Sequence, residues 1–229
     1  MFNKKQMVTM LTLQNSMNYK VNSDWLQAGN DWSLAAMMEA TEAIDHHGWK
    51  WWKHQEPDMD QLQMELVDIW HFILSGVMEE GCHGSIDTIS EIMLELIEET
   101  KIGVTTTDSF NGLPVKPAGM TLVELLKLFA GSCASGLMPT HVFLLIVERS
   151  GMTTDDLYKQ YIGKNVLNFF RQDNGYKDGT YQKIWAGRED NEHLTEILQE
   201  LDATVDDFET HLYDALGRIY KLATKTEAA

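Results

Sequence analysis

The stretch from Asp60 to Gly81 is apolar on nearly every side of a predicted helix, yet it carries two acids, Glu65 and Asp68. A helix that lacks a polar face lies at the centre of a fold, where other elements cover it. The two acids are three residues apart, so they project from one side of the helix, among leucine, isoleucine and phenylalanine. Because an unpaired buried charge is very costly, this side of the helix predicts a bound cation. Salt bridges to lysines of another helix are the alternative interpretation.

A second pair of acids with the same spacing, Glu39 and Glu42, lies on the helix that we predict from Asp31 or Ser33 to His47. Alanines surround this pair, and their small side chains allow another helix to approach closely. Four carboxylates from two packed helices supply the oxygen ligands that hard cations such as Mg²⁺ prefer. The helices of residues 33–81 therefore predict a site for about two or three Mg²⁺ ions, or for Mn²⁺. The predicted ligands are Glu39, Glu42, Glu65 and Asp68.

Tryptophan and lysine alternate in the connection between these helices, Gly48-Trp-Lys-Trp-Trp-Lys53. Large rings of this kind often anchor a hydrophobic core. Beside an acidic metal site they also suit a wall on which a base stacks, with a lysine to neutralise phosphate. Trp49, Trp52 and Lys53 are therefore candidate substrate contacts, and core anchoring is the alternative.

The segment from Lys164 to Lys183 is basic, aromatic and rich in glycine inside an acidic chain. Its cations, Lys164 among them, are spaced so that a helix end and a turn can converge on one anion. A solvated loop is the alternative, but the local reversal of charge favours an anion site. Near the N-terminus, Gln14 and Asn18 form a polar pair four residues apart, either a solvated edge or a binding pair.

Apolar residues recur with the helical period along most of the chain, and no convincing strand alternation appears. We therefore predict an all-α fold, a multi-helix bundle with a mobile helical subdomain, in a single domain of residues 1–229. Several helices are apolar on two sides, so a second subunit can complete the bundle. Loops are predicted at 102–119 and 185–191. The predicted helices are 5–18, 33–47, 60–81, 86–101, 121–135, 139–149, 155–171, 192–200 and 205–224.

Composition argues against several classes of function. The chain of 229 residues holds 35 acidic and 18 basic residues, a net charge of −17. This balance argues against a surface that binds nucleic acid or an anionic membrane, although a small anion can still bind through a metal. Only Cys82 and Cys133 are present, which is no disulfide framework, and the N-terminal segment lacks the apolar run of a signal peptide. We therefore expect a cytoplasmic protein.

Clustered carboxylates, a basic glycine-rich segment and aromatic side chains together describe a site for a polyphosphate joined to a base. Metal ions neutralise phosphate oxygens and lower the pKa of water, and a neighbouring carboxylate can take its proton. No serine or cysteine nucleophile with a histidine partner is evident in the sequence. The predicted reaction is therefore hydrolysis of a phosphoanhydride by direct attack of water.

These residues resemble the dimeric, all-α dUTPases of the all-α nucleoside triphosphate pyrophosphatases, a superfamily that includes the MazG-type enzymes. That superfamily has an E-x-x-E motif followed by E-x-x-D, matched here by Glu39-x-x-Glu42 and Glu65-x-x-Asp68. Further blocks lie in family order across most of the chain. They are Leu13-Gln14 with Asn18, Trp49 to Lys53, Glu65 to Ser75, Tyr161 to Asn168 with Arg171, Asn174 to Tyr181, and Gly187 to Asn191.

The resemblance implies Mg²⁺-dependent hydrolysis of dUTP to dUMP and diphosphate by a homodimer, with dUDP as a further substrate, which limits uracil incorporation into DNA. It implies that the four acids hold Mg²⁺ and that Glu39 orients or deprotonates the attacking water. It also implies that a segment of about 155–191 closes over the nucleotide. The implied substrate contacts are Gln14 and Asn18 for the uracil edge, Trp52 and Phe72 for the pocket walls, Asn168 for deoxyribose, and Arg171, Lys177, Tyr181 and Lys183 for phosphate.

Other interpretations stay open. A broader pyrophosphatase of the dCTP/dUTP or MazG type would share the acids and differ in the base pocket. A di-iron carboxylate bundle normally needs two Glu-x-x-His motifs, and the nearest strings are Asp68-x-x-His71 and Glu80-x-x-His83. The last alternative is a helical protein without catalytic activity.

Overall fold

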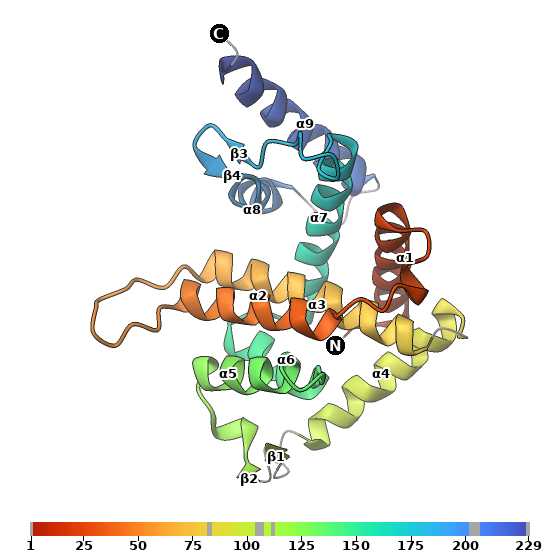
Figure 1. Ribbon diagram of the computed structural model, residues 1–229, viewed down its shortest axis with the longest axis vertical. Coiled ribbons are helices and arrows are strands. Elements are labelled where there is room, and N and C mark those ends of the chain that lie inside the picture. The colour runs from red at the N-terminus through yellow and green to blue at the C-terminus, as the bar shows by residue number, and fades with distance from the viewer. Residues whose placement is uncertain (1, 82–83, 104–107, 111–112, 202–206, 228–229) are drawn as a thin grey trace.

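The computed structural model describes residues 2–81, 84–103, 108–110, 113–201 and 207–227. Within these ranges the fold is all-α, as predicted, and strands form only two short antiparallel pairs (Figure 1). The α-helices are α1 Lys4–Val21, α2 Trp32–His47, α3 Met59–Glu80, α4 Ile86–Gly103, α5 Leu122–Cys133, α6 Thr140–Arg149, α7 Thr154–Asp173, α8 Asp190–Glu200 and α9 Phe208–Glu227. The short 3₁₀ helices are η1 Trp25–Gln27 and η2 Pro117–Gly119, and the strands are β1 Asp108–Phe110, β2 Leu113–Val115, β3 Ile184–Trp185 and β4 Arg188–Glu189.

Helix α3 is the centre of the fold, because neighbours cover most of its surface. Helix α2 runs alongside it, and α1, α6 and α7 also pack against it (Figure 1). Its fully buried Trp70 stacks between Phe2 and Phe143, with ring centroids 5.6 and 5.5 Å away. The Trp70 ring nitrogen donates to the sulfur of Met10 at 3.3 Å. The central position predicted for the apolar helix 60–81 is thereby confirmed.

The other elements are arranged around this centre. Helices α5 and α6 pair with each other, and α5 packs under α2 (Figure 1). Helices α8 and α9 gather with the β3–β4 pair beside α7, at the end of the molecule where the C-terminus lies. In the part of the chain that the structure describes, no helix combines the length and the apolar character needed to cross a membrane.

The two helices that carry the acids begin and end where the sequence indicates. Asp31 accepts a hydrogen bond from the backbone N–H of Leu34 at the start of α2, and Asp58 does the same for Gln61 at the start of α3. Gly48 ends α2 with φ at 85°, a backbone conformation that favours glycine. These local signals set where each helix starts, and therefore which face carries its acids.

Two predicted loops are wrong in part. The segment 102–119 contains the antiparallel pair β1–β2, and the segment 185–191 contains β4 together with the start of α8, at Asp190 instead of Glu192. Strands of two or three residues are too short to show an alternation of apolar and polar side chains, so the pattern could not reveal them. Residues 104–107 and 111–112 of the first segment lie outside the described residues, as do Cys82 and His83.

Candidate active site

Helices α2 and α3 bring three carboxylates together. Glu39 and Glu42 lie on α2 and Glu65 on α3, and oxygen atoms of all three lie within 4.8 Å of one another. Glu65 is buried, Glu39 is half-buried and Glu42 is exposed. The fully buried residues of α2 are all alanines, whose small side chains let the helix lie close to its neighbours. Three of the four acids predicted from the sequence therefore lie together in the fold.

Burial and repulsion change the acid–base chemistry of this cluster. Burial, together with the charges of Asp68, Glu65 and Glu42, raises the pKa of Glu39 to about 8. Burial and the charge of Asp68 raise the pKa of Glu65 to about 7, against the opposing effect of Lys164. Glu39 and Glu65 also share a side-chain hydrogen bond, which favours a proton on Glu39. Without a cation, the cluster therefore holds a proton at neutral pH.

Asp68, the fourth predicted acid, already has a cation beside it. Its Oδ2 lies 2.7 Å from the Nζ atom of Lys164, whose side chain is 2% exposed. Lys164 also donates to Oδ1 of Asn191 at 2.9 Å. The alternative interpretation of the acids, a salt bridge to a lysine of another helix, is thus realised at Asp68, while Glu39, Glu42 and Glu65 face one another.

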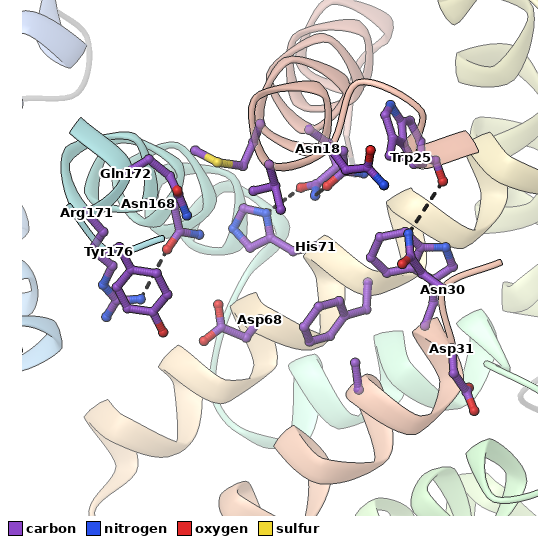
Figure 2. Close-up of a pocket in the computed structure, with 17 residues that line it drawn as sticks. Asn18, Trp25, Asn30, Asp31, Asp68, His71, Asn168, Arg171, Gln172 and Tyr176 are labelled. Carbon is purple, nitrogen blue, oxygen red and sulfur yellow. Dashed lines mark hydrogen bonds between the residues drawn. The ribbon is translucent and has the colours of Figure 1, made fainter. Parts of the chain in front are cut away.

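Two cavities meet at Asp68, Arg171 and Tyr176, which line both of them. The first, of about 680 Å³, is called here the acidic half, and the second, of about 500 Å³, the aromatic half. Figure 2 shows the aromatic half, with Asp68 between Arg171 and Tyr176 on one side and Trp25 on the other. The acidic half is lined by residues that include Glu39, Glu42, His46, Glu65, Lys164, Lys183, Glu189 and Asn191. The aromatic half is lined by residues that include Gln14, Asn18, Trp25, Trp32, His71, Phe72 and Asn168.

Arg171 is held in place by the first residues of α8. Its Nε and Nη2 atoms donate to the two carboxylate oxygens of Asp190, each at 2.8 Å. The Tyr181 hydroxyl donates to the same carboxylate at 2.8 Å. Burial opposes ionisation of Asp190, but its hydrogen bonds and the charge of Arg171 outweigh that effect and lower its pKa. Asn191 accepts hydrogen bonds from both Arg171 and Lys164, so it fixes the separation of the two cations.

Aromatic rings and buried amides form the aromatic half. The rings of Trp32 and Phe72 stack with centroids 6.3 Å apart, and Trp25 meets Trp32 edge-on at 6.1 Å. Gln14 and Asn18, from α1, are buried and joined by a hydrogen bond of 2.9 Å. Flat rings beside amide donors and acceptors are suited to a heterocyclic base.

Four predicted site residues line neither cavity. Trp49, Trp52 and Lys53 lie around a separate hollow, made by residues 48–55 between α2 and α3. That connection extends beyond the ends of both helices (Figure 1). Lys177 donates to the backbone oxygen of Val21 at 3.1 Å. The predicted contacts of these residues with substrate remain predictions.

A fifth predicted residue, Tyr181, also lines neither cavity, and its hydroxyl donates to Asp190. Conversely, several residues of the site were not predicted as substrate contacts. Trp25 and Trp32 flank the start of α2 and resemble ordinary core residues in sequence. Asp190 and Asn191 stand in the Gly187–Asn191 block, whose position in family order was the one available signal.

The string Asp68-x-x-His71 does not add a histidine to the acids. The Nδ1 atom of His71 is bonded to Gln14, in the aromatic half, and burial lowers the pKa of His71 to about 4. Among the described residues, the group able to hold a metal consists of carboxylates alone. Such an oxygen-only set is typical of Mg²⁺ or Mn²⁺ sites.

The sequence model of the dUTPase family matches residues 6–176 of the chain. The match includes the three clustered carboxylates, Asp68, Lys164 and Arg171, and it ends before Asp190 and Asn191. Comparison with curated proteins finds no match.

The raised pKa of Glu39 predicts how the metal-free protein responds to pH. An acid whose pKa is higher in the folded than in the unfolded protein stabilises the fold at pH values below its unfolded pKa, here about 4.5. This stabilisation is lost as the pH rises towards the folded pKa of about 8. We therefore expect Glu39→Gln to melt at a higher temperature than the wild type at pH 8, with a difference that shrinks towards pH 5. Thermal unfolding of chelator-treated protein across this range measures the difference.

The control is Glu80→Gln, which removes an exposed acid at the end of the neighbouring helix, α3. Its melting difference from the wild type should not grow between pH 5 and pH 8. If the difference in melting temperature between Glu39→Gln and the wild type is constant with pH, ionisation of Glu39 does not destabilise the fold, and the prediction is wrong.

Proposed function

Because the chain belongs to the dUTPase family and hydrolyses dUTP to dUMP and diphosphate, we propose that the acidic and aromatic halves together bind this substrate. The proposal rests on one observation: the acidic half and the aromatic half meet at Asp68, Arg171 and Tyr176, which line both. A nucleotide has a flat base at one end and a charged phosphate chain at the other. A site with aromatic rings at one end and carboxylates with cations at the other matches that shape and polarity.

Mg²⁺ is the proposed cofactor, with Glu39, Glu42, Glu65 and Asp68 as its ligands. The fit rests on oxygen atoms of three acids within 4.8 Å and on the raised pKa values of Glu39 and Glu65, because a cation relieves their repulsion. Mn²⁺ suits the same oxygen donors. When bound, the metal would neutralise phosphate oxygens and assist attack by water.

The chain's own residues then have distinct roles around the phosphates. Lys164 and Arg171 hold phosphate oxygens, because each lines the acidic half and has more N–H donors than its bonds within the protein use. Lys183 adds charge at the exposed rim. Glu39 orients the attacking water and takes its proton, because a cation that relieves the repulsion in the cluster leaves its carboxylate ionised.

The base lies in the aromatic half in this proposal. Phe72 and Trp32 stack on it, while Gln14 and Asn18 bond its polar edge and Asn168 meets the sugar.

dUDP is a second proposed substrate, because it contains the same anhydride bond next to the nucleoside phosphate. A cytoplasmic location belongs to the same proposal and is supported by Cys133, which is buried and free of any disulfide.

A homodimer is the proposed assembly. The connection between α2 and α3 exposes large rings, with Trp51 91% exposed, and Leu34 and Met38 project from α2 one helical turn apart at 49% each. Exposed apolar groups on α2 and on the connection that follows it favour contact with another protein surface. The dimeric family that the sequence resembles makes a second copy the proposed partner.

For the metal site, we expect Glu39→Gln to lower kcat for dUTP by about 10³-fold, because the proposed base and ligand is lost. Diphosphate release measures the effect, and circular dichroism checks that the helices remain. Chelation of metal should abolish turnover in the wild type, and Mg²⁺ should restore it. The exposed Glu80→Gln variant should turn over normally. Full activity of Glu39→Gln, or of metal-free enzyme, would contradict the metal site.

For the phosphate contacts, we expect Asp190→Asn to lower kcat/KM by about 10²-fold, because Arg171 loses its charged anchor and shifts. Steady-state kinetics measures the loss. The control is Glu196→Gln, which breaks the exposed pair with Arg188 in the same part of the chain and should have no effect. A folded Asp190→Asn enzyme with unchanged kcat/KM would contradict the proposed role of Arg171.

For the assembly, we expect light scattering to give twice the chain mass of 26.1 kDa. Trp51→Lys should shift this mass towards the monomer, since it places a charge in the proposed contact. The exposed Ile92 of α4 offers a control, and Ile92→Lys should leave the mass unchanged. A monomeric wild-type protein at micromolar concentration would refute the dimer.

A further inference from the structure

A directed chain of hydrogen bonds runs through the wall of the aromatic half. The Ser75 hydroxyl donates to the backbone oxygen of His71 at 2.8 Å, and the amide nitrogen of Asn18 donates to the Ser75 oxygen at 2.9 Å. The amide nitrogen of Gln14 donates to the amide oxygen of Asn18 at 2.9 Å. The Nδ1 atom of His71 meets the amide oxygen of Gln14 at 2.5 Å. All four side chains are buried, and Ser75 is 0% exposed.

Each bond in this chain sets the direction of the next. Ser75 has a single proton, which goes to His71, so its oxygen can only accept from Asn18. Asn18 must then turn its oxygen to Gln14, and Gln14 must turn its oxygen to His71. An oxygen cannot donate, so the imidazole proton sits on Nδ1 of His71. Tyr161 does not decide this direction, because its hydroxyl has one proton and lies 2.9 Å from both the Gln14 oxygen and the backbone oxygen of Met10.

The other ring nitrogen of His71 confirms that the chain ends there. Its Nε2 atom is buried and has no hydrogen-bond partner among the described residues. With the proton on Nδ1, Nε2 is a bare acceptor buried within the wall. The order of the bonds therefore fixes which atoms of Gln14 and Asn18 donate and which accept.

The direction of an amide beside a pyrimidine decides which base edge it pairs with. Uracil presents an N–H at N3 beside carbonyl acceptors, whereas cytosine presents a bare N3 beside an amino donor. Reversing a carboxamide interchanges its donor and its acceptor. An amide fixed in one direction therefore pairs with one base edge and opposes the other, while an amide free to turn can pair with both.

We propose that Ser75 and His71 are positioning residues that hold the Asn18 amide in the direction that selects uracil over cytosine. Ser75 does not line the cavity, so it acts only through Asn18. Reversal would require the Ser75 hydroxyl to leave His71, both amides to turn, and the imidazole proton to move to Nε2. This inference rests on the proposed function, in which the base lies against Gln14 and Asn18.

The first test is Ser75→Ala, with kcat/KM measured for dUTP and for dCTP. We expect the dUTP/dCTP ratio to fall by about tenfold, the effect of losing one hydrogen bond that fixes the amide. The matched control is Ser90→Ala, because Ser90 is also 0% exposed and donates to a backbone oxygen of its own helix, that of Asp87. Its ratio should equal that of the wild type. An unchanged ratio in Ser75→Ala, or an equal fall in both variants, would overturn the proposal.

The second test reads the tautomer of His71 directly. Nitrogen NMR of the His71 ring in the substrate-free enzyme should show the proton on Nδ1 and a bare Nε2. Ser75→Ala should shift this signal towards a mixture of the two tautomers. A proton on Nε2 in the wild type would mean that the chain runs in the opposite direction, and would overturn the proposal.

The variant Asn18→Ala distinguishes a failure of this inference from a failure of the proposed function on which it rests. If Asn18→Ala leaves the dUTP/dCTP ratio unchanged, the base does not lie against Asn18, and the proposed base site fails together with the inference. If Asn18→Ala lowers the ratio and Ser75→Ala does not, the base site stands and only the positioning role of Ser75 and His71 fails.

Discussion

Repulsion among carboxylates that are partly withdrawn from water is the constraint on which the rest of this structure depends. Glu39, Glu42 and Glu65 sit within 4.8 Å of one another beside an otherwise apolar central helix. Such a cluster is stable only if some groups keep a proton or a cation lies between them. The shared hydrogen bond of Glu39 and Glu65 is the first of these solutions, and the proposed Mg²⁺ is the second. The ion pair of Asp68 with Lys164 removes one more uncompensated charge.

The cations opposite the acids impose a second requirement, because Lys164 and Arg171 are themselves largely buried. Each needs acceptors, and the start of α8 supplies them through Asp190 and Asn191. The site is therefore closed by a segment outside the residues 6–176 that match the dUTPase family. Helix α7 carries both cations and thus links the acid-bearing helices to the C-terminal elements.

Much of the fold follows from local sequence. Helical periodicity is visible over long segments, and caps such as Asp31 and Gly48 mark boundaries within a few residues. The paired acids were also predictable, because a spacing of three residues fixes one face of a helix whatever lies around it. The β1–β2 and β3–β4 pairs were not, since they are too short to carry a pattern.

Tertiary neighbours were the part that sequence could not supply. Trp49 and Trp52 follow the acids closely in sequence, yet they line a separate hollow in a connection that extends beyond the ends of α2 and α3 (Figure 1). Trp32 and Phe72 instead meet across two helices to form a wall. The resemblance implied that Arg171 contacts phosphate, but only the folded chain shows Asp190 beside it. The most direct test of the account is a crystal structure with Mg²⁺ and a non-hydrolysable dUTP analogue. It should show uracil between Phe72 and Asn18 with the phosphates between Glu39 and Arg171, whereas a base stacked on Trp49 or Trp52 would contradict it.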